Sequence, residues 1–185
     1  QPPVASPTPA AGREVLWALA LALGSVLPCA AVLAAGRTLV WGDTAALFGP
    51  IRPLVVEYLR DLRLPLWNPY EAFGIPLHAQ MIHAALHPIS VFAAWLAPSA
   101  GMDLLVVANV LVAALGAGLL ARSLGTTRSA ALVAGYAYAL SGYLLGIGAV
   151  LQYQTAAATA PWAVAALHRA GRAGWRGIGI GGLGV

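Results

Sequence analysis

The chain consists of long runs of uncharged residues separated by shorter segments that carry its charges. A helix of about 20 apolar residues crosses the hydrocarbon core of a bilayer, so these runs predict membrane-spanning helices. The expected spans are residues 15–36, 104–121, 129–151 and 152–168, with the start of another at 177. Residues 1–12 are rich in Pro and Ala without apolar periodicity, which predicts a disordered tail. The fold class that follows is all-α, a polytopic transmembrane helical bundle.

The first apolar run, residues 15–36, can also be interpreted as a secretory signal peptide, because "AVLAAG" near its end offers small residues for cleavage. The apolar region of a signal peptide is about 7 to 15 residues long, and this run is longer. Since further spans follow, we interpret it as a helix that stays in the membrane. The chain ends in an apolar stretch too short to cross a bilayer, so we expect an amino-terminal part of a longer protein, inactive alone.

The arginines decide which side each loop faces, because cytoplasmic loops carry an excess of basic residues. Residues 86–97 have the length of an interfacial or re-entrant segment rather than of a span. If they do not cross, six arginines share the side of the amino terminus with one acid, Glu14. These arginines are Arg13, Arg122, Arg128, Arg169, Arg172 and Arg176. We therefore expect a cytoplasmic amino terminus and one long external loop, residues 37–103.

Within the external loop, apolar residues at helical spacing predict an amphipathic helix. They are Ile51, Leu54, Val55, Tyr58, Leu59 and Leu62. A helix that faces a protein core shows the same pattern, but a chain this apolar offers no soluble core. We therefore expect this helix to lie on the outer membrane surface.

The composition agrees with a membrane protein and excludes several function classes. Hydrophobic residues make up 60% of the 185 residues and charged residues 9%, far below the roughly 25% charged residues of soluble domains. The net charge of +4 comes mainly from arginines in short loops, with no basic stripe interleaved with aromatics, so no nucleic-acid partner is expected. Cys29 is the single cysteine, which excludes an internal disulfide and most thiolate metal sites.

Two acidic residues of the external loop are candidates for catalysis. Asp43 lies just beyond the first span, in "WGDT", and a carboxylate there can orient and deprotonate a hydroxyl that attacks a sugar. Asp43 can equally cap a short helix that starts at Thr44, a common position for Asp. Glu71 is the second acidic candidate.

Three arginines of the same loop are candidates for binding a phosphate. Arg52, Arg60 and Arg63 carry guanidinium groups, which bind phosphate oxygens in pairs. Attraction to anionic lipid head groups would use the same residues, and the sequence does not separate the two interpretations.

The segment "LPLWNPYEAFGIPLHAQ" supplies further candidates for binding a substrate. Trp67 and Tyr70 can stack on a sugar or anchor the loop at the membrane interface. Asn68 and His78 complete the candidate set. His83 and His87 would share a face of a helix, and two such histidines can bind a metal, but the spacing fixes no third ligand. The alternative is that these histidines make hydrogen bonds at the interface.

The residues "LVWGDTAALFGPIRPLVVEYLRDLRLPLWNPYEAFGIPLHAQ" and "LHPIS" resemble the YfhO-like bacterial membrane proteins, a branch of the GT-C glycosyltransferase superfamily. The resemblance covers roughly residues 39–150. It implies a larger, GT-C-like membrane enzyme whose first external loop places an acidic residue near the site of sugar transfer, which favours the catalytic interpretation of Asp43. Relatives differ in their use of divalent ions, so a divalent metal cofactor stays open.

The function expected from this resemblance is sugar transfer from a polyprenyl-phosphate donor to a cell-envelope glycopolymer or glycolipid. The reaction would take place on the outer face of the bacterial inner membrane, with the lipid bilayer as a further partner. The alternative is a non-enzymatic lipid-carrier transporter or membrane assembly subunit. Transport would be favoured by an ionisable residue inside a span, and every acid lies outside the predicted spans.

Overall fold

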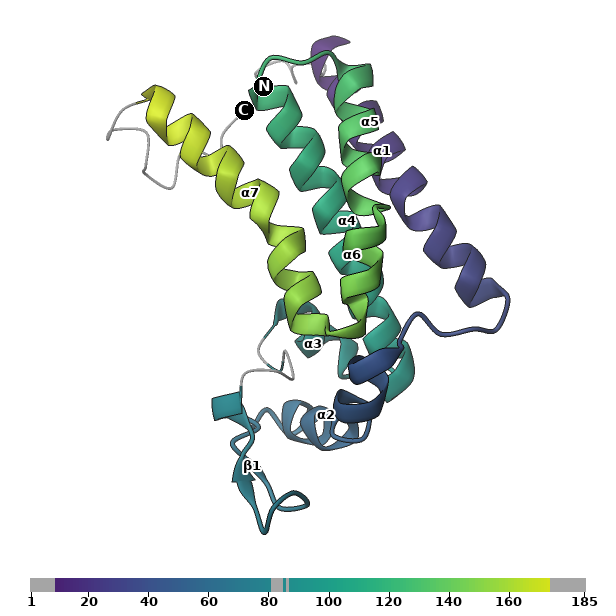
Figure 1. The fold of residues 1–185 in the computed structure, drawn as a ribbon, viewed down its shortest axis with the longest axis vertical. Helices are drawn as coiled ribbons and strands as arrows, with labels where there is room; N and C mark the ends of the chain where they lie inside the picture. Colours follow the sequence, from purple (N-terminus) through teal and green to yellow (C-terminus); the bar gives the residue numbers. More distant parts are fainter. Residues whose placement is uncertain (1–8, 81–84, 86, 174–185) are drawn as a thin grey trace, which may run out of the picture.

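The structure, a computed structural model, describes residues 9–80, 85 and 87–173. Long helical segments run along the length of the molecule in Figure 1. They are α1 (Pro9–Ala34), α4 (Pro98–Ser123), α5 (Arg128–Ala139) continued by α6 (Gly142–Gly146), and α7 (Leu151–Ala173). Helix α4 is central, because α1, α5 and α7 all pack against it.

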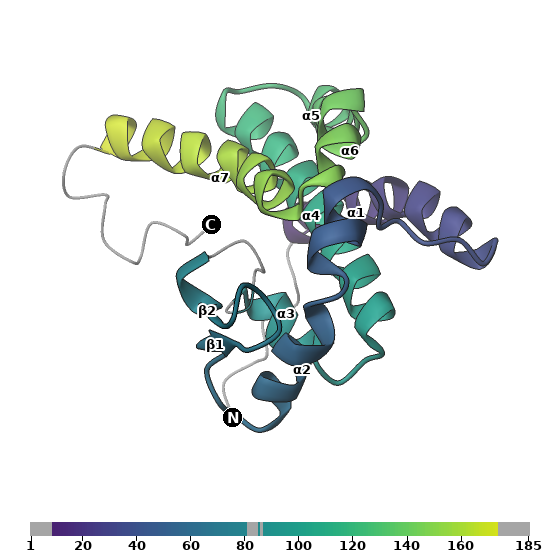
Figure 2. The ribbon, with the colours of Figure 1, turned by 60° about the horizontal axis from the view of Figure 1, so that its bottom comes forward.

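Short elements between α1 and α4 gather at one end of the bundle, which we call the loop end (Figure 1). They are η1 (Thr44–Phe48), α2 (Arg52–Arg60), β1 (Trp67–Asn68), β2 (Ile75–Pro76), η2 (His78–Gln80) and α3 (Pro88–Ala93). The two strands pair antiparallel, with Trp67 opposite Pro76. Figure 2 brings this end forward and shows α2 and α3 beside α4. A 3-10 turn, η3 (Ile147–Ala149), joins α6 to α7 and contacts η1.

Three helical segments of the described chain are long and apolar enough to cross a membrane. They are Gly12–Ala34, Pro98–Ser123 and Arg128–Ala149. Helix α7 covers the fourth expected span, 152–168, but it is not among them. Gln152, Gln154 and Thr155 lie near its start and lower its hydropathy. The chain is thus a helical membrane protein by the length and composition of these three segments.

Several helix boundaries differ from the sequence expectations. Helix α1 begins at Pro9, so residues 9–12 of the expected tail are helical. Helix α4 begins at Pro98 rather than at 104 and includes Asp103. Proline suits the first turn of a helix, and a span defined by its uncharged residues misses a helical turn that holds an acid. The expected span start at 177 lies outside the described residues.

The external segment 86–97 was expected not to cross the membrane. Its described part holds α3, a helix of six residues. Six residues of helix extend only about 9 Å, much less than the hydrocarbon thickness, so α3 cannot span a bilayer.

The opposite end of the bundle joins three helix ends through charge. Glu14 near the start of α1 forms an ion pair with Arg128 at the start of α5. Its carboxylate also lies 3.7 Å from Arg122 Nη2 in the last turn of α4. We call this the arginine end. Glu14, Arg122 and Arg128 therefore lie at the same end of the bundle, in agreement with the topology in which all three share the side of the amino terminus.

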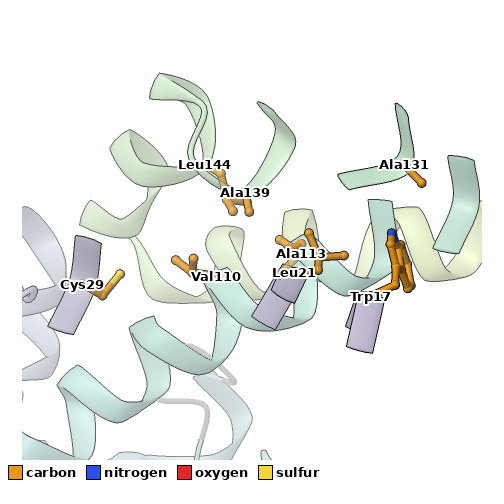
Figure 3. Packing of buried hydrophobic residues seen from close by; sticks show 10 residues of the cluster. Trp17, Leu21, Cys29, Val110, Ala113, Ala131, Ala139 and Leu144 are labelled. Atoms are coloured by element: carbon orange, nitrogen blue, oxygen red, sulfur yellow. The ribbon is translucent and has the colours of Figure 1, made fainter. Parts of the chain in front are cut away.

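Small residues let the bundle helices approach closely. A Cβ atom added at Gly118 of α4 would lie 2.6 Å from Cδ2 of Leu21, and one added at Gly135 of α5 would lie 2.6 Å from Cδ1 of the same leucine. Leu21 is fully buried where α1, α4 and α5 meet. Figure 3 shows it among the labelled core residues, which are Trp17, Leu21, Cys29, Val110, Ala113, Ala131, Ala139 and Leu144. Such close approach replaces the hydrophobic effect as the source of helix association in lipid.

Aromatic side chains also donate hydrogen bonds across this bundle. The Tyr136 hydroxyl donates to the carbonyl oxygen of Ala20 at 2.6 Å. Gly24, one turn further along α1, leaves the space that the tyrosine ring fills, since a Cβ there would lie 2.4 Å from its hydroxyl oxygen. Trp162 Nε1 donates in the same way to the carbonyl of Val112 at 2.8 Å.

The expectation that α2 lies on the membrane surface through its apolar face is wrong for the centre of that face. Val55 and Leu59 are buried and pack against Leu77, Ala85 and Ala94, all from the same chain segment. Residues that follow α2 fold back over it and form a small protein core. The periodicity was correctly interpreted as amphipathic, but it does not tell lipid from protein as the partner.

Candidate functional site

The loop that leaves α1 is fixed first by Asp103 of α4. The carboxylate oxygen Oδ1 accepts hydrogen bonds from the Thr38 hydroxyl at 2.8 Å and from the backbone N–H of Leu39 at 2.7 Å. Two donors on one ionised oxygen form strong, charge-assisted hydrogen bonds. This acid, which falls in the expected external loop 37–103, therefore joins the preceding part of that loop to the start of α4.

A second anchor is Thr44, the first residue of η1. Its hydroxyl donates toward the carbonyl oxygens of Ala149 at 2.9 Å and Gly148 at 3.1 Å. The same oxygen accepts a hydrogen bond of 3.0 Å from the backbone N–H of Leu151. Leu151 begins α7, and the first N–H groups of a helix have no partner within it. Thr44 therefore caps α7 from a distant part of the chain, and it is fully buried.

Gly42 brings the loop into contact with the same corner. Its φ is +58°, in the left-handed region that favours glycine. A Cβ atom on Gly42 would lie 2.8 Å from Cβ of Ala149. Any other residue would therefore both strain the backbone and collide with the corner between η3 and α7.

Asp43 stands between these two fixed neighbours with its side chain exposed. It occupies the position before η1, yet it makes no side-chain cap hydrogen bond to that turn. Its carboxylate has no hydrogen bond or ion pair to any of the described residues. The structure thus shows an exposed carboxylate without a partner among the described residues, and its side chain does not cap η1, which was the alternative interpretation.

Glu71, the other acidic candidate, belongs to a turn organised by Asn68. The Asn68 side chain is fully buried, accepts from the backbone N–H of Tyr70 at 3.0 Å and donates to Glu71 Oε2 at 3.2 Å. An asparagine that bonds the backbone two residues later forms an Asx turn. Asn68 therefore shapes the loop, and Glu71 is held by it within the turn.

Two of the three arginine candidates are engaged with protein groups. Arg60 donates from Nε to the carbonyl of Ala94 at 2.6 Å and from Nη2 to the carbonyl of Leu96 at 3.0 Å. It thereby binds free carbonyls at the end of α3. Arg63 pairs with Asp61 at 2.6 Å on the exposed surface, with its guanidinium 5.2 Å from the centre of the Tyr58 ring.

Arg52 differs from Arg60 and Arg63 because its side chain is buried and no carboxylate pairs with it. Its side chain is 4% exposed and donates to Ser90 Oγ at 3.2 Å and, weakly, to the Ser90 carbonyl at 3.4 Å. Its Nε has no hydrogen-bond partner. All six acids lie in the described residues, and none forms an ion pair with it. Burial lowers the pKa of the Arg52 guanidinium from its ordinary value.

The aromatic candidates are exposed on the strand pair and its turn. Tyr70 is 82% exposed, and Trp67 is about half exposed. The indole of Trp67 lies over Gly74, where a Cβ would be 2.4 Å from Cζ2 and the φ is +106°. The Trp67 ring is therefore held in place on one side and open on the other.

The histidines do not form a cluster in the described part of the chain. His78 is half-buried on η2, and His83 lies outside the described residues. His87 caps α3, since its Nδ1 accepts from the backbone N–H of Ile89 at 3.3 Å. Burial lowers the pKa of His87. No group of three His, Cys, Asp or Glu side chains suited to a metal ion occurs among the described residues.

Direct hydrogen bonds among the candidate residues join only Asn68 to Tyr70 and to Glu71, within the described chain. Sequence reasoning missed Thr44 and Asp103, which position the loop around Asp43. The available signal was the "GDT" sequence itself, in which a glycine and a hydroxyl residue flank the acid.

The chain has no significant match among protein-family models, curated proteins or solved structures. The resemblance to YfhO-like proteins expected from roughly residues 39–150 of the sequence is therefore neither supported nor contradicted by these comparisons.

Proposed function

We propose that this chain is part of a membrane glycosyltransferase of the YfhO-like branch of the GT-C superfamily. It would move a sugar from a polyprenyl-phosphate donor to a cell-envelope acceptor on the outer face of the bacterial inner membrane. The observation that carries the proposal is Asp43, an exposed and unpaired carboxylate held at the loop end of a membrane bundle. A lipid-linked sugar presents its reacting carbon just above the hydrocarbon boundary, where a span ends.

In the proposed reaction, the oxygen of an acceptor hydroxyl attacks the anomeric carbon of the donor sugar. The bond between that carbon and the phosphate oxygen breaks, and polyprenyl phosphate leaves with the electron pair. The hydroxyl proton passes to the carboxylate of Asp43, which acts as the general base. A single displacement of this kind inverts the anomeric configuration, as in the base half of an inverting glycosidase.

The remaining candidates take narrower parts in this proposal. Arg60 and Arg63 bond to protein groups within the loop. Arg52 is a buried cation that pairs with no acid among the described residues, so it is the arginine whose charge still lacks a counter-ion. Trp67 and Tyr70 offer open rings for stacking on the sugar. Glu71 is the second candidate acid, with Asn68 fixing its turn.

The proposed orientation places the arginine end in the cytoplasm and the loop end outside. It rests on the excess of arginine at the arginine end, which the positive-inside rule assigns to the cytoplasmic face.

The rival function, a lipid-carrier transporter or assembly subunit, would be favoured by an unpaired acid inside a span. Glu14 lies at the start of the apolar segment Gly12–Ala34 but is paired with Arg128, which leaves Asp103 to consider. Asp103 lies inside α4, which is apolar enough to span, and an acid within a span often marks a transport path. However, Asp103 lies near the start of that helix and binds Thr38 and Leu39 of the loop. Its hydrogen bonds account for it as a structural anchor, which favours the enzyme.

A donor assay with the full-length protein tests the proposal. Membranes that contain the protein would be given polyprenyl-phosphate donors carrying a radiolabelled sugar. The proposal predicts release of polyprenyl phosphate and label in an envelope polymer or lipid. Intact donor that has only moved between leaflets would contradict it and support the transporter.

A further inference from the structure

Thr44 follows Asp43 directly in the chain, and its side-chain hydrogen bonds join it to the corner between η3 and α7. We propose that Thr44 is a positioning residue, which fixes the Asp43 carboxylate at the loop end by locking the corner between η3 and α7. This inference rests on the proposed function, in which Asp43 is the base. It assigns to Thr44 a role in the rate of sugar transfer and not only in folding.

No side-chain contact of its own among the described residues holds Asp43 in place. Its carboxylate makes no hydrogen bond or ion pair with the described residues, so its place is set by its backbone. That backbone is fixed on one side by Gly42 against Ala149 and on the other by Thr44. Consecutive Cα atoms lie only 3.8 Å apart, so two fixed neighbours leave the backbone of Asp43 little freedom.

Buried side chains of α4 and α7 also fix the corner between η3 and α7. Gln154 of α7 donates from Nε2 to the carbonyl of Leu144 at 3.4 Å and accepts at Oε1 from Asn109 of α4 at 3.3 Å. Asn109 also donates to the Thr155 hydroxyl at 3.0 Å. Both amide side chains are buried, where a polar group without a partner is costly. Because Thr44 binds this corner, the position of the loop at Asp43 depends on the packing of α4 and α7.

The Thr44 hydroxyl makes the contacts with this corner. It donates toward the carbonyls of Gly148 and Ala149 and accepts from Leu151, so it joins η1 to the corner through three backbone groups. Valine has the shape of threonine but can make none of these bonds. Serine keeps the hydroxyl and loses only a methyl group. The pair Thr44→Val and Thr44→Ser therefore isolates the contribution of the hydroxyl.

The test measures kcat and donor KM for sugar transfer by the full-length protein, normalised to the folded protein recovered. Thr44→Val should lower kcat by about 100-fold, because a displaced catalytic group costs that much, while donor KM stays unchanged. Thr44→Ser should keep kcat within about threefold of the parent. A normal kcat in Thr44→Val protein, or an equal loss in Thr44→Ser, would overturn the inference.

A double-mutant cycle separates this inference from the proposed function. If Thr44 acts only through Asp43, Thr44→Val should cause no further loss in protein that already carries Asp43→Asn. A full additional loss in the double variant would overturn positioning and leave Asp43 as the base. Normal transfer by Asp43→Asn alone would instead overturn the proposed function, whatever Thr44→Val does.

A second measurement is independent of activity. A spin label on Asp43→Cys, in protein with Cys29→Ser, should become more mobile when Thr44→Val is added and stay immobilised with Thr44→Ser. Equal mobility in both would overturn the inference. If Thr44→Val is not recovered folded, Gly42→Ala displaces Asp43 from its other side, and its kcat and label mobility then decide by the same criteria.

Discussion

The hydroxyl of Tyr138 on α5 donates a hydrogen bond of 2.8 Å to the carbonyl oxygen of Ala157 on α7. In a regular helix that carbonyl would accept from the N–H of the residue four positions later, but this residue is Pro161, which has none. Tyr138 thus supplies the hydrogen bond that the proline removes. The bond explains how α7 tolerates a proline in its interior.

We predict that Tyr138→Phe destabilises the bundle by about 1 kcal/mol or more, because it leaves the Ala157 carbonyl without a partner in an apolar environment. Unfolding of the detergent-solubilised protein by SDS, followed by circular dichroism, would measure the change. Tyr143→Phe is the matched control, since Tyr143 is mostly exposed. Equal effects of the two substitutions would argue against the role of Tyr138.

A second prediction concerns the contact between Gly116 and Trp162. A Cβ on Gly116 would lie 2.5 Å from the indole, so Gly116→Ala must displace Trp162 from its hydrogen bond with Val112. The expected loss of stability is about 1–3 kcal/mol, typical of overpacking. Gly142→Ala, with no atom within 4 Å of the added group, should be neutral or slightly stabilising in the same unfolding assay.

The buried face of α2 gives a third prediction. Leu59→Ala should destabilise the loop end by about 2 kcal/mol or more, because it leaves a cavity against Leu77 and Ala94. Leu62→Ala removes the same atoms from a side chain that is 87% exposed and should have little effect. Proteolysis of the region between α1 and α4 would report the difference. Resistance equal to the parent in Leu59→Ala would show that this face is not a protein core.

A fourth prediction follows from the lowered pKa of His87. Burial places the folded-state pKa below the ordinary value of 6.5, so the folded chain favours the neutral ring that accepts from Ile89. The stability from this cap is fully present above pH 6.5 and is lost as the pH falls through the lower folded-state pKa. His87→Asn keeps a capping side chain without titrating. Its stability should therefore fall less than that of the parent between pH 7.5 and 5, measured by thermal unfolding.

The long helices could be predicted because an uncharged run of the right length has few structures open to it in a membrane. The start of α4 was placed too late because the expected span was ended at its first charged residue, Asp103. Asp103 in fact lies inside the helix and binds Thr38 of the loop. A contact between residues so far apart leaves no local signal. For α7 the uncharged run was visible, but its glutamines make it less apolar than the other spans.

The candidate site was predictable only in part. Asp43 stood out because it lies shortly after an apolar run, whereas Thr44 acts through the remote residues Gly148 and Leu151. The apolar period of α2 was correct, yet it carried no information on what covers the face. Arg60 was a candidate for binding a phosphate or a lipid head group, and in the structure it binds the end of α3, because a helix end offers free carbonyls that the sequence does not mark.

The role of Asp43 as the base for sugar transfer is tested by its substitution with asparagine. Asp43→Asn keeps the size of the side chain but cannot accept a proton near neutral pH. In membranes with the full-length protein, sugar transfer should fall by about 100-fold or more, the usual scale for general acid-base catalysis, while expression and donor binding persist. Asp61→Asn, which removes an exposed acid paired with Arg63, should transfer sugar nearly as well as the parent. Near-normal transfer by Asp43→Asn would contradict the account.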